Sequence, residues 1–310
     1  LEQLARCPLA WFYQRGLRLQ LPEDPLYDPN QWLNHLDRGS LLHEIFERFV
    51  RAWRGHQDEI AGAEAVVTLE AIVDERLASW ARKVPPPSAA VLDSESADIH
   101  RTARSFLQME IDALATRGHG TWHDVELAFG VEAKPAWFTL ASGDRLAIHG
   151  RIDRVDEVQG GFVIVDYKTG NPKKHAKDPK QGPFNGGRSL QPAIYAAAVA
   201  SVLGKPVQAF EYRFPTLKGR NTTVRYEQAE MAPAAALVEQ LLEHVATGHF
   251  LPTLDPSDCS SCDCRPICRV QVSEYFKVEE SPRADWAAGQ AGILEAYRGM
   301  RERRNAGAGE

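Results

Sequence analysis

The 310-residue sequence predicts a mixed α/β fold in which a mainly antiparallel sheet is flanked by helices. Apolar residues recur at helical spacing through much of residues 40–117. Residues 122–168 instead break into short β-rich segments separated by turn residues. An alanine-rich helical pattern returns at 188–203, and two further β-rich segments follow it. Helices before and after a run of short strands are typical of a sheet with helices on its faces.

The first strong helix is expected to begin at Ser40, a residue type favoured at N-caps. Apolar side chains from Leu41 to Trp53 then fall on one arc of that helix. Residues 58–82 and 97–117 are also expected to be helical. We interpret residues 55–120 as a helical insertion within the domain.

Six segments have the short, β-rich character of strands, and residues 232–247 form a further predicted helix. The predicted strands are Val125–Phe129, Trp137–Leu140, Arg145–Val158, Phe162–Lys168, Ala209–Phe214 and Thr222–Tyr226.

The chain is expected to form a single domain over residues 1–282, with a cysteine-rich loop at 252–270 and a charged helical tail at 283–310. It does not begin with Met, which suggests a piece of a longer protein. No run approaches the roughly 18 apolar residues of a membrane span, and no signal peptide is evident. We therefore expect a cytoplasmic protein without membrane contact.

Two aspartates and a lysine form the most informative pattern. A tight turn at Gln159-Gly160 would place Asp153 directly opposite Asp166 in an antiparallel hairpin. Directly opposed residues have Cβ atoms roughly 4.5–5.5 Å apart, so the two carboxylates would repel unless a cation lay between them. Oxygen ligands favour Mg²⁺ or Mn²⁺. The pair therefore predicts a divalent metal site.

Lys168 follows Asp166 by two residues, so the two side chains share one face of the strand. The lysine could hold a phosphate or stabilise negative charge that develops on phosphorus. A metal beside it would activate water and shield the phosphate charge. This combination suits hydrolysis of phosphodiester bonds.

These residues resemble a known family. Gly150-Arg151-Ile152-Asp153-Arg154 followed by Val165-Asp166-Tyr167-Lys168-Thr169-Gly170 is similar to the core of the RecB-like branch of the PD-(D/E)XK nuclease superfamily. Further motifs of that branch occur in order: Gly39 to His43, Glu126, and Gln191 with Tyr195 in a Q-x-x-x-Y pattern. The resemblance covers nearly the whole chain, from about Leu4 to Arg269.

The resemblance implies a role for each of these residues. His43, Asp153 and Asp166 would hold Mg²⁺ or Mn²⁺, with the carbonyl of Tyr167 as a further ligand, and Glu126 would bind metal or orient water. Lys168 would assist attack on phosphorus. Gln191 and Tyr195 lie one helical turn apart and would contact a DNA strand or position Lys168. A basic loop, residues 173–180, would contact the phosphate backbone.

Four cysteines could hold a second metal centre. Cys259-x2-Cys262-x5-Cys268 lies near one end of the chain and Cys7 near the other. Four thiolates suit either a tetrahedral zinc or a cubane iron–sulfur cluster, and their spacing does not choose between them. The pattern resembles the iron–sulfur nuclease domains of AddB-type helicase–nuclease subunits, which implies a structural [4Fe-4S] cluster. Cys264 is extra, so Cys262 or Cys264 could be the ligand.

The resemblance thus implies an exonuclease acting in double-strand break repair at the bacterial nucleoid. Its substrate would be DNA, a single strand at a duplex end, supplied by a helicase subunit or fused helicase domain. The chain has no GxxxxGK[ST] loop of its own. The formal net charge of −6 counts against general DNA binding but not against a nuclease with acidic metal ligands.

Three other functions also fit the sequence. The first is a free-standing single-strand exonuclease similar to CRISPR-adaptation nucleases. The second is a catalytically silent iron–sulfur DNA-binding module. The third is a zinc-bound scaffold without nucleic acid.

Overall fold

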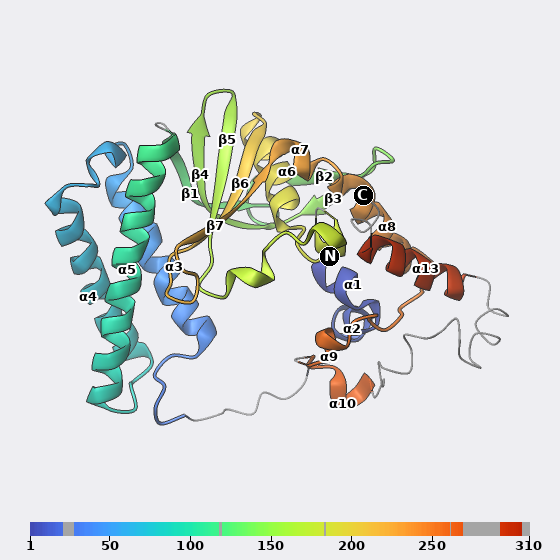
Figure 1. Ribbon diagram of the computed structural model, residues 1–310, viewed down its shortest axis with the longest axis horizontal. Coiled ribbons are helices and arrows are strands. Elements are labelled where there is room, and N and C mark those ends of the chain that lie inside the picture. Colours follow the sequence, from blue (N-terminus) through green and yellow to red (C-terminus); the bar gives the residue numbers. More distant parts are fainter. Residues whose placement is uncertain (21–27, 118–119, 183, 261, 269–291, 306–310) are drawn as a thin grey trace.

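A computed structural model describes residues 1–20, 28–117, 120–182, 184–260, 262–268 and 292–305 (Figure 1). Its centre is a five-stranded sheet in the order β1-β4-β5-β6-β7. Every neighbouring pair is antiparallel except β5 and β6, which run parallel. The strands are β1 (Thr121–Phe129), β4 (Gly150–Val158), β5 (Gly161–Tyr167), β6 (Val207–Phe214) and β7 (Thr222–Glu227). The predicted fold class, a mainly antiparallel mixed sheet flanked by helices, is confirmed.

The β4–β5 hairpin has the predicted register from its turn to Arg154 and Val165, but Asp153 and Asp166, which were expected to lie directly opposite each other, are not a pair of the ladder. Val158 pairs with Gly161 across the turn, and pairing continues to Arg154 opposite Val165. Gly160 has a φ of +85°, which glycine adopts without strain. At Gly161 an added Cβ would lie 2.1 Å from the carbonyl oxygen of Pro206, so only glycine fits. The two glycines therefore fix both the turn and the approach of the neighbouring chain.

The single strand expected over Arg145–Val158 is wrong. The structure divides it into β3 (Arg145–Ile148) and β4, which begins at Gly150. β3 pairs with β2 (Ala136–Thr139) in a separate two-stranded sheet, whereas β4 pairs with β1 and β5. The break arises because the two halves have different partners, which local strand propensity does not report.

Three long helices cover one face of the sheet: α3 (His35–Trp53), α4 (Ala63–Lys83) and α5 (Ala89–Arg117) (Figure 1). Aromatic side chains of α3 and α5 meet β5 there, with the rings of Phe46 and Phe106 4.3 Å apart and Tyr167 at 5.3 Å from each. The segment expected as an insertion therefore supplies one wall of a hydrophobic core. Large apolar side chains pack this way because burying their area is the main stabilising term.

Three predicted helix starts are wrong. α4 begins at Ala63 rather than at residue 58, because Gln57–Glu59 forms a separate 3-10 turn. α3 is capped by Asn34, whose side chain accepts hydrogen bonds from the backbone of Leu36 and Asp37, and Ser40 lies inside the helix. The hydroxyl of Ser40 donates to the Leu36 carbonyl one turn earlier. α5 begins at Ala89 rather than at residue 97, because its first turns pack on the other helices of this layer.

The opposite face of the sheet packs on α6 (Gln191–Leu203), with Pro192 in its first turn as expected. α7 (Gln228–Met231) and α8 (Ala234–Thr247) follow β7 and complete this side. The core here is a second cluster of buried residues that includes Phe129, Ile152, Ile164, Phe210 and Tyr212. The sheet is thus a layer between two separate hydrophobic cores.

The two ends of the described chain meet beside α6. α1 (Glu2–Arg6) and α2 (Pro8–Trp11) lie next to α9 (Pro256–Cys259) in Figure 1, and the Leu9 backbone N–H donates to the Leu251 carbonyl. Asp258 of α9 accepts a 2.6 Å hydrogen bond from Arg188, just before α6. α10 (Arg265–Cys268) and α13 (Ile293–Arg304) follow, and the latter lies within residues 283–310. Residues 269–291, where that tail was expected to start, lie outside the described residues.

Among the helices that the structure describes, none combines the length and the apolar character needed to cross a membrane.

Candidate active site

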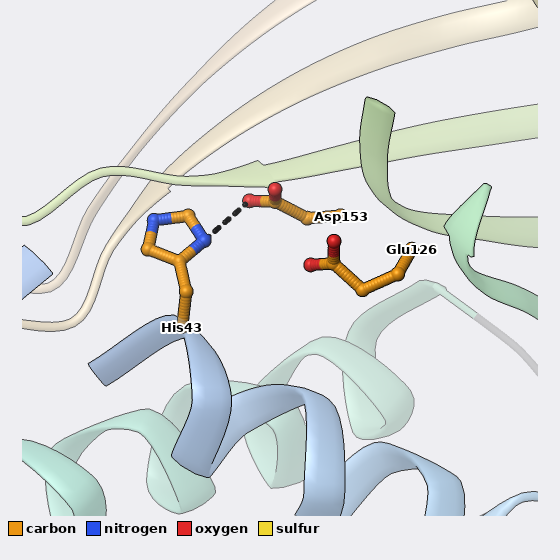
Figure 2. Close-up of side chains that lie close together, drawn as sticks. All are labelled: His43, Glu126 and Asp153. Carbon is orange, nitrogen blue, oxygen red and sulfur yellow. Dashed lines mark ion pairs between the residues drawn. The ribbon is translucent and has the colours of Figure 1, made fainter. Parts of the chain in front are cut away.

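Three side chains from three elements converge at one end of the β4–β5 hairpin. His43 comes from α3, Glu126 from β1 and Asp153 from β4, and their ligand atoms all lie within 4.8 Å of one another (Figure 2). Figure 2 shows both carboxylates turned toward the imidazole. With Glu47 and Tyr167 they line a cavity of about 10 Å³, the space of a single water molecule or small ion.

An irregular backbone brings Glu126 to this position. Val125 packs in the core beside α3 and α5, whereas Leu127 packs against the core beside α6. Residues two apart in a regular strand share a face, so β1 changes face at Glu126. Glu126 itself has a φ of 57°, in the left-handed region that is costly for residues other than glycine. Such strain collects at functional sites, where the surrounding structure holds it in place.

Asp153 occupies a matching irregularity in β4. Ile152 and Val155 both pack in the core beside α6, although residues three apart would normally lie on opposite faces. Asp153 Oδ2 accepts a 2.7 Å hydrogen bond from the backbone N–H of Tyr167 and lies 3.3 Å from His43 Nδ1. The Asp153 carboxylate thus accepts a backbone hydrogen bond that a carbonyl would accept in a regular strand pair, and it also faces His43.

Asp166 lies beside this trio and is held by different partners. Its Oδ2 is 2.7 Å from Lys168 Nζ, and its Oδ1 accepts a 2.9 Å hydrogen bond from Gln191 Nε2. Asp166 is 3% exposed, whereas the Lys168 side chain is 26% exposed, so the ion pair is shielded from water on its aspartate side only. The predicted D-x-K pair and the first residue of Q-x-x-x-Y therefore meet at one carboxylate.

The Asp153 carboxylate raises the pKa of two neighbouring carboxylates. Burial and the charge of Asp153 raise the pKa of Asp166 to about 6. Burial, followed by the charges of Asp153 and Glu47, raises the pKa of Glu126. Burial lowers the pKa of His43, but the Asp153 carboxylate outweighs this effect and raises it overall. The site concentrates negative charge where solvent cannot screen it.

This donor set fits a divalent cation. One imidazole nitrogen and clustered carboxylates are ligands that Mg²⁺ and Mn²⁺ accept. A cation among them would favour the ionised form of each carboxylate and relieve the repulsion that raises their pKa. The arrangement can therefore hold a metal next to a lysine, which is the chemistry that the sequence predicted.

Tyr195 lies on the helix turn after Gln191. Burial, and then the charge of Asp166, raises the pKa of the Tyr195 hydroxyl to about 12. Its ring packs 5.8 Å from the ring of Phe129 and 6.2 Å from that of Phe210, so the side chain is part of the core edge as well as the site.

A buried ionic network beneath the site was not foreseen from the sequence. Glu110 of α5 contacts both Arg154 (2.8 Å) and Arg213 (2.7 Å), and it accepts a hydrogen bond from the Tyr167 hydroxyl at 2.9 Å. Glu110 and Arg154 are each 1% exposed. The only local signal was the alternation of charged and apolar residues in β4 and β6. The network fixes Tyr167, the residue between Asp166 and Lys168.

The lysines of the basic loop after β5, residues 173–180, differ in their contacts. Lys173 and Lys174 are exposed. Lys177 instead pairs with Glu230 at 2.5 Å and lies over the ring of Tyr226. Lys180 is exposed as well, so lysines at both ends of the loop are available to a phosphate backbone.

The cysteines approach one another across the two ends of the chain. Burial, with smaller contributions from the charges of Cys262 and Cys268, raises the pKa of the Cys7 thiol to about 11. Burial, followed by the charges of Cys262 and Cys268, also raises the pKa of the Cys259 thiol. Cys264 is buried, and its thiol faces the carbonyl of Ala10 at 3.9 Å.

The fold and site together define a nuclease. The model of the PD-(D/E)XK nuclease superfamily matches residues 1–269, and the chain belongs to that superfamily.

The chain is also similar to the B subunits of the ATP-dependent helicase/deoxyribonucleases of several bacteria. It is 31% identical to that of Symbiobacterium thermophilum over 94% of this chain and 23% of the relative. Identity to the Alkaliphilus oremlandii protein is 27% over 97% of this chain and 26% of the relative. For Clostridium tetani it is 29%, over 57% of this chain and 16% of the relative. The chain thus spans about a quarter or less of these relatives.

One solved structure, "Crystal structure of SSO0001", aligns with a TM-score of 0.30 at 14% identity over 84% of this chain and 94% of that chain.

Proposed function

We propose that this domain is a metal-dependent DNA exonuclease that hydrolyses phosphodiester bonds in a bacterial AddAB-type helicase–nuclease. The observation that carries the proposal is the convergence of His43, Glu126 and Asp153 within 4.8 Å, beside the Asp166–Lys168 ion pair. Membership of the nuclease superfamily and similarity to deoxyribonuclease subunits support the same reaction.

The ligands we propose for Mg²⁺ or Mn²⁺ are His43, Asp153 and Asp166, with the Tyr167 carbonyl as a further ligand. The position of Glu126 beside His43 and Asp153 supports a role for it in the same metal site. A bound divalent cation lowers the pKa of its water and shields phosphate charge. The protein contributes the fixed donor set that holds it.

Lys168 is the group that we propose to act on the phosphate. Its ammonium lies 2.7 Å from Asp166 Oδ2, and its side chain is 26% exposed, so it can reach a substrate from the site. An ammonium fixed there stabilises negative charge as it develops on phosphorus. Gln191 holds Asp166 from the other side. We propose that Tyr195, one helical turn further along α6, contacts the DNA strand.

We propose a structural [4Fe-4S] cluster on Cys7, Cys259, Cys262 and Cys268. The charge of Cys262 contributes to the raised pKa of both Cys7 and Cys259, whereas the buried Cys264 thiol faces the carbonyl of Ala10. This difference favours Cys262 as the ligand.

The proposed substrate is single-stranded DNA at a duplex end, delivered by a helicase partner in the cytoplasm at the nucleoid. The relatives carry both helicase and deoxyribonuclease in their names, and this chain spans only part of their length. The exposed lysines at residues 173 and 174 lie just after the active strand and could hold the strand's backbone.

The test is cleavage of single-stranded DNA labelled at either end, with Mg²⁺, by the wild type and Lys168→Ala. We expect the wild type to release short products from one end and EDTA to abolish the reaction. Lys168→Ala should lower kcat by roughly 100- to 1,000-fold while DNA still binds. Binding without cleavage by the wild type would point to a silent DNA-binding module. Neither binding nor cleavage would reject the proposal.

A further inference from the structure

A buried tyrosine of β6 lies directly beneath the catalytic lysine and aspartate. Tyr212 pairs with Asp166 in the parallel β5–β6 ladder and is 1% exposed. Its ring lies 5.4 Å from the Lys168 ammonium, close enough for a cation–π contact. Although it belongs to the hydrophobic core, Tyr212 therefore contacts Lys168 and lies next to Asp166.

The hydroxyl of Tyr212 continues a chain of hydrogen bonds. It donates to Gln191 Oε1 over 3.1 Å, and Gln191 Nε2 donates to Asp166 Oδ1 over 2.9 Å. Asp166 Oδ2 then meets Lys168 Nζ at 2.7 Å. Four side chains from three elements thus form one continuous polar path inside a largely apolar region.

The direction of this path follows from hydrogen-bonding capacity. An ionised carboxylate only accepts, so Asp166 requires the NH₂ end of the Gln191 amide. The oxygen end of that amide then needs a donor, and Tyr212 supplies one. A buried acceptor without a partner costs more free energy than a made hydrogen bond contributes. Both ends of the amide are consequently fixed in one orientation.

We propose that Tyr212 is a positioning residue of the nuclease: its hydroxyl orients Gln191, which holds Asp166 in the rotamer that faces Lys168. This inference rests on the proposed function, because it assigns the relay to the reaction at that site. Tyr212 does not touch the substrate, and the contact of its ring with the Lys168 ammonium is kept in Tyr212→Phe. Its contribution should be to kcat rather than to DNA affinity.

The chain offers a matched control in Tyr226. It is 0% exposed, lies in the neighbouring strand β7, and its ring is 6.3 Å from that of Tyr212. Its hydroxyl faces Ser189 rather than the site. Tyr226→Phe therefore removes the same atom from the same core without touching the relay.

The experiment compares Tyr212→Phe with Tyr226→Phe in two measurements. In protein with ¹⁵N-labelled glutamine, the side-chain amide signal assigned through Gln191→Ala should move in Tyr212→Phe but not in Tyr226→Phe. On single-stranded DNA with Mg²⁺, Tyr212→Phe should lower kcat about five- to tenfold at unchanged KM, the scale of one hydrogen bond. In the Gln191→Ala background the same substitution should have no further effect, since the hydroxyl acts through the amide.

An unmoved Gln191 signal would overturn the proposal whether or not the domain cleaves DNA, so its failure is distinguishable from failure of the proposed function. Additive losses in the double variant would also overturn it. So would equal kcat values for the two tyrosine variants in an active enzyme.

Discussion

The backbone N–H of Tyr167 donates a 2.7 Å hydrogen bond to Asp153 Oδ2. This bond lies just beyond Arg154 and Val165, the last residue pair of the β4–β5 ladder. Asp153 therefore has two roles, one in the fold and one in the site. The same carboxylate oxygen lies 3.3 Å from His43 Nδ1.

Asp153→Asn separates these two roles. An asparagine oxygen can still accept from Tyr167, but the negative charge needed by a metal is lost. We expect thermal stability close to wild type, with cleavage reduced by roughly 100-fold or more. Calorimetry and a DNA cleavage assay measure the two effects. Asp144→Asn, in the exposed turn between β2 and β3, is the matched control and should leave both unchanged.

Glu110→Gln should destabilise the domain by about 3 kcal/mol at neutral pH, because it removes the carboxylate that joins the buried Arg154 and Arg213 and leaves each arginine with one carboxylate, Asp156 and Glu211 respectively. Burial alone would raise the pKa of Glu110, but the charges of the two arginines lower it to about 2. Denaturant unfolding of both proteins measures the difference.

The pH dependence of that difference has a fixed sign. A depressed pKa contributes stability that is present above the unfolded value near 4.5 and is lost as the pH falls toward 2. The gap between wild type and Glu110→Gln should therefore shrink over this range. A gap that stays constant from pH 5 to about pH 2 would show that Glu110 is not held ionised by the arginines.

Cys268→Ala should remove iron and lower stability, because the cluster would join segments at opposite ends of the chain. Iron and acid-labile sulfide, assayed after anaerobic purification, are the readout. Cys264→Ala is the comparison and should retain both, since its thiol faces Ala10. Full iron in the Cys268 variant, or its loss in the Cys264 variant, would contradict the proposed ligand set.

Local sequence patterns were sufficient for much of the fold. The glycines after Gln159 set the hairpin register because a tight turn leaves little choice of pairing. Apolar periodicity likewise located the helix from Leu41 to Trp53. Its start was missed because the cap at Asn34 lies outside the apolar arc that marks the helix.

Sequence motifs indicated the residues that converge in the candidate site but not their geometry. Glu126 and Asp153 reach His43 only because two neighbouring strands are irregular at the same level, a feature without a sequence signature. Tyr212 and Glu110 were overlooked for another reason. In the sequence, Tyr212 resembles an ordinary core residue and Glu110 an ordinary helix residue. Their contacts become evident only once β6 and α5 are packed against β5.

The most direct test of the proposed metal site is the rate of single-stranded DNA cleavage as a function of free Mg²⁺, for wild type and Asp153→Asn. We predict no cleavage in EDTA, saturable activation of the wild type, and little activation of the variant at any concentration. Cleavage that persists without divalent metal, or that is equal in the two proteins, would contradict the proposed metal site.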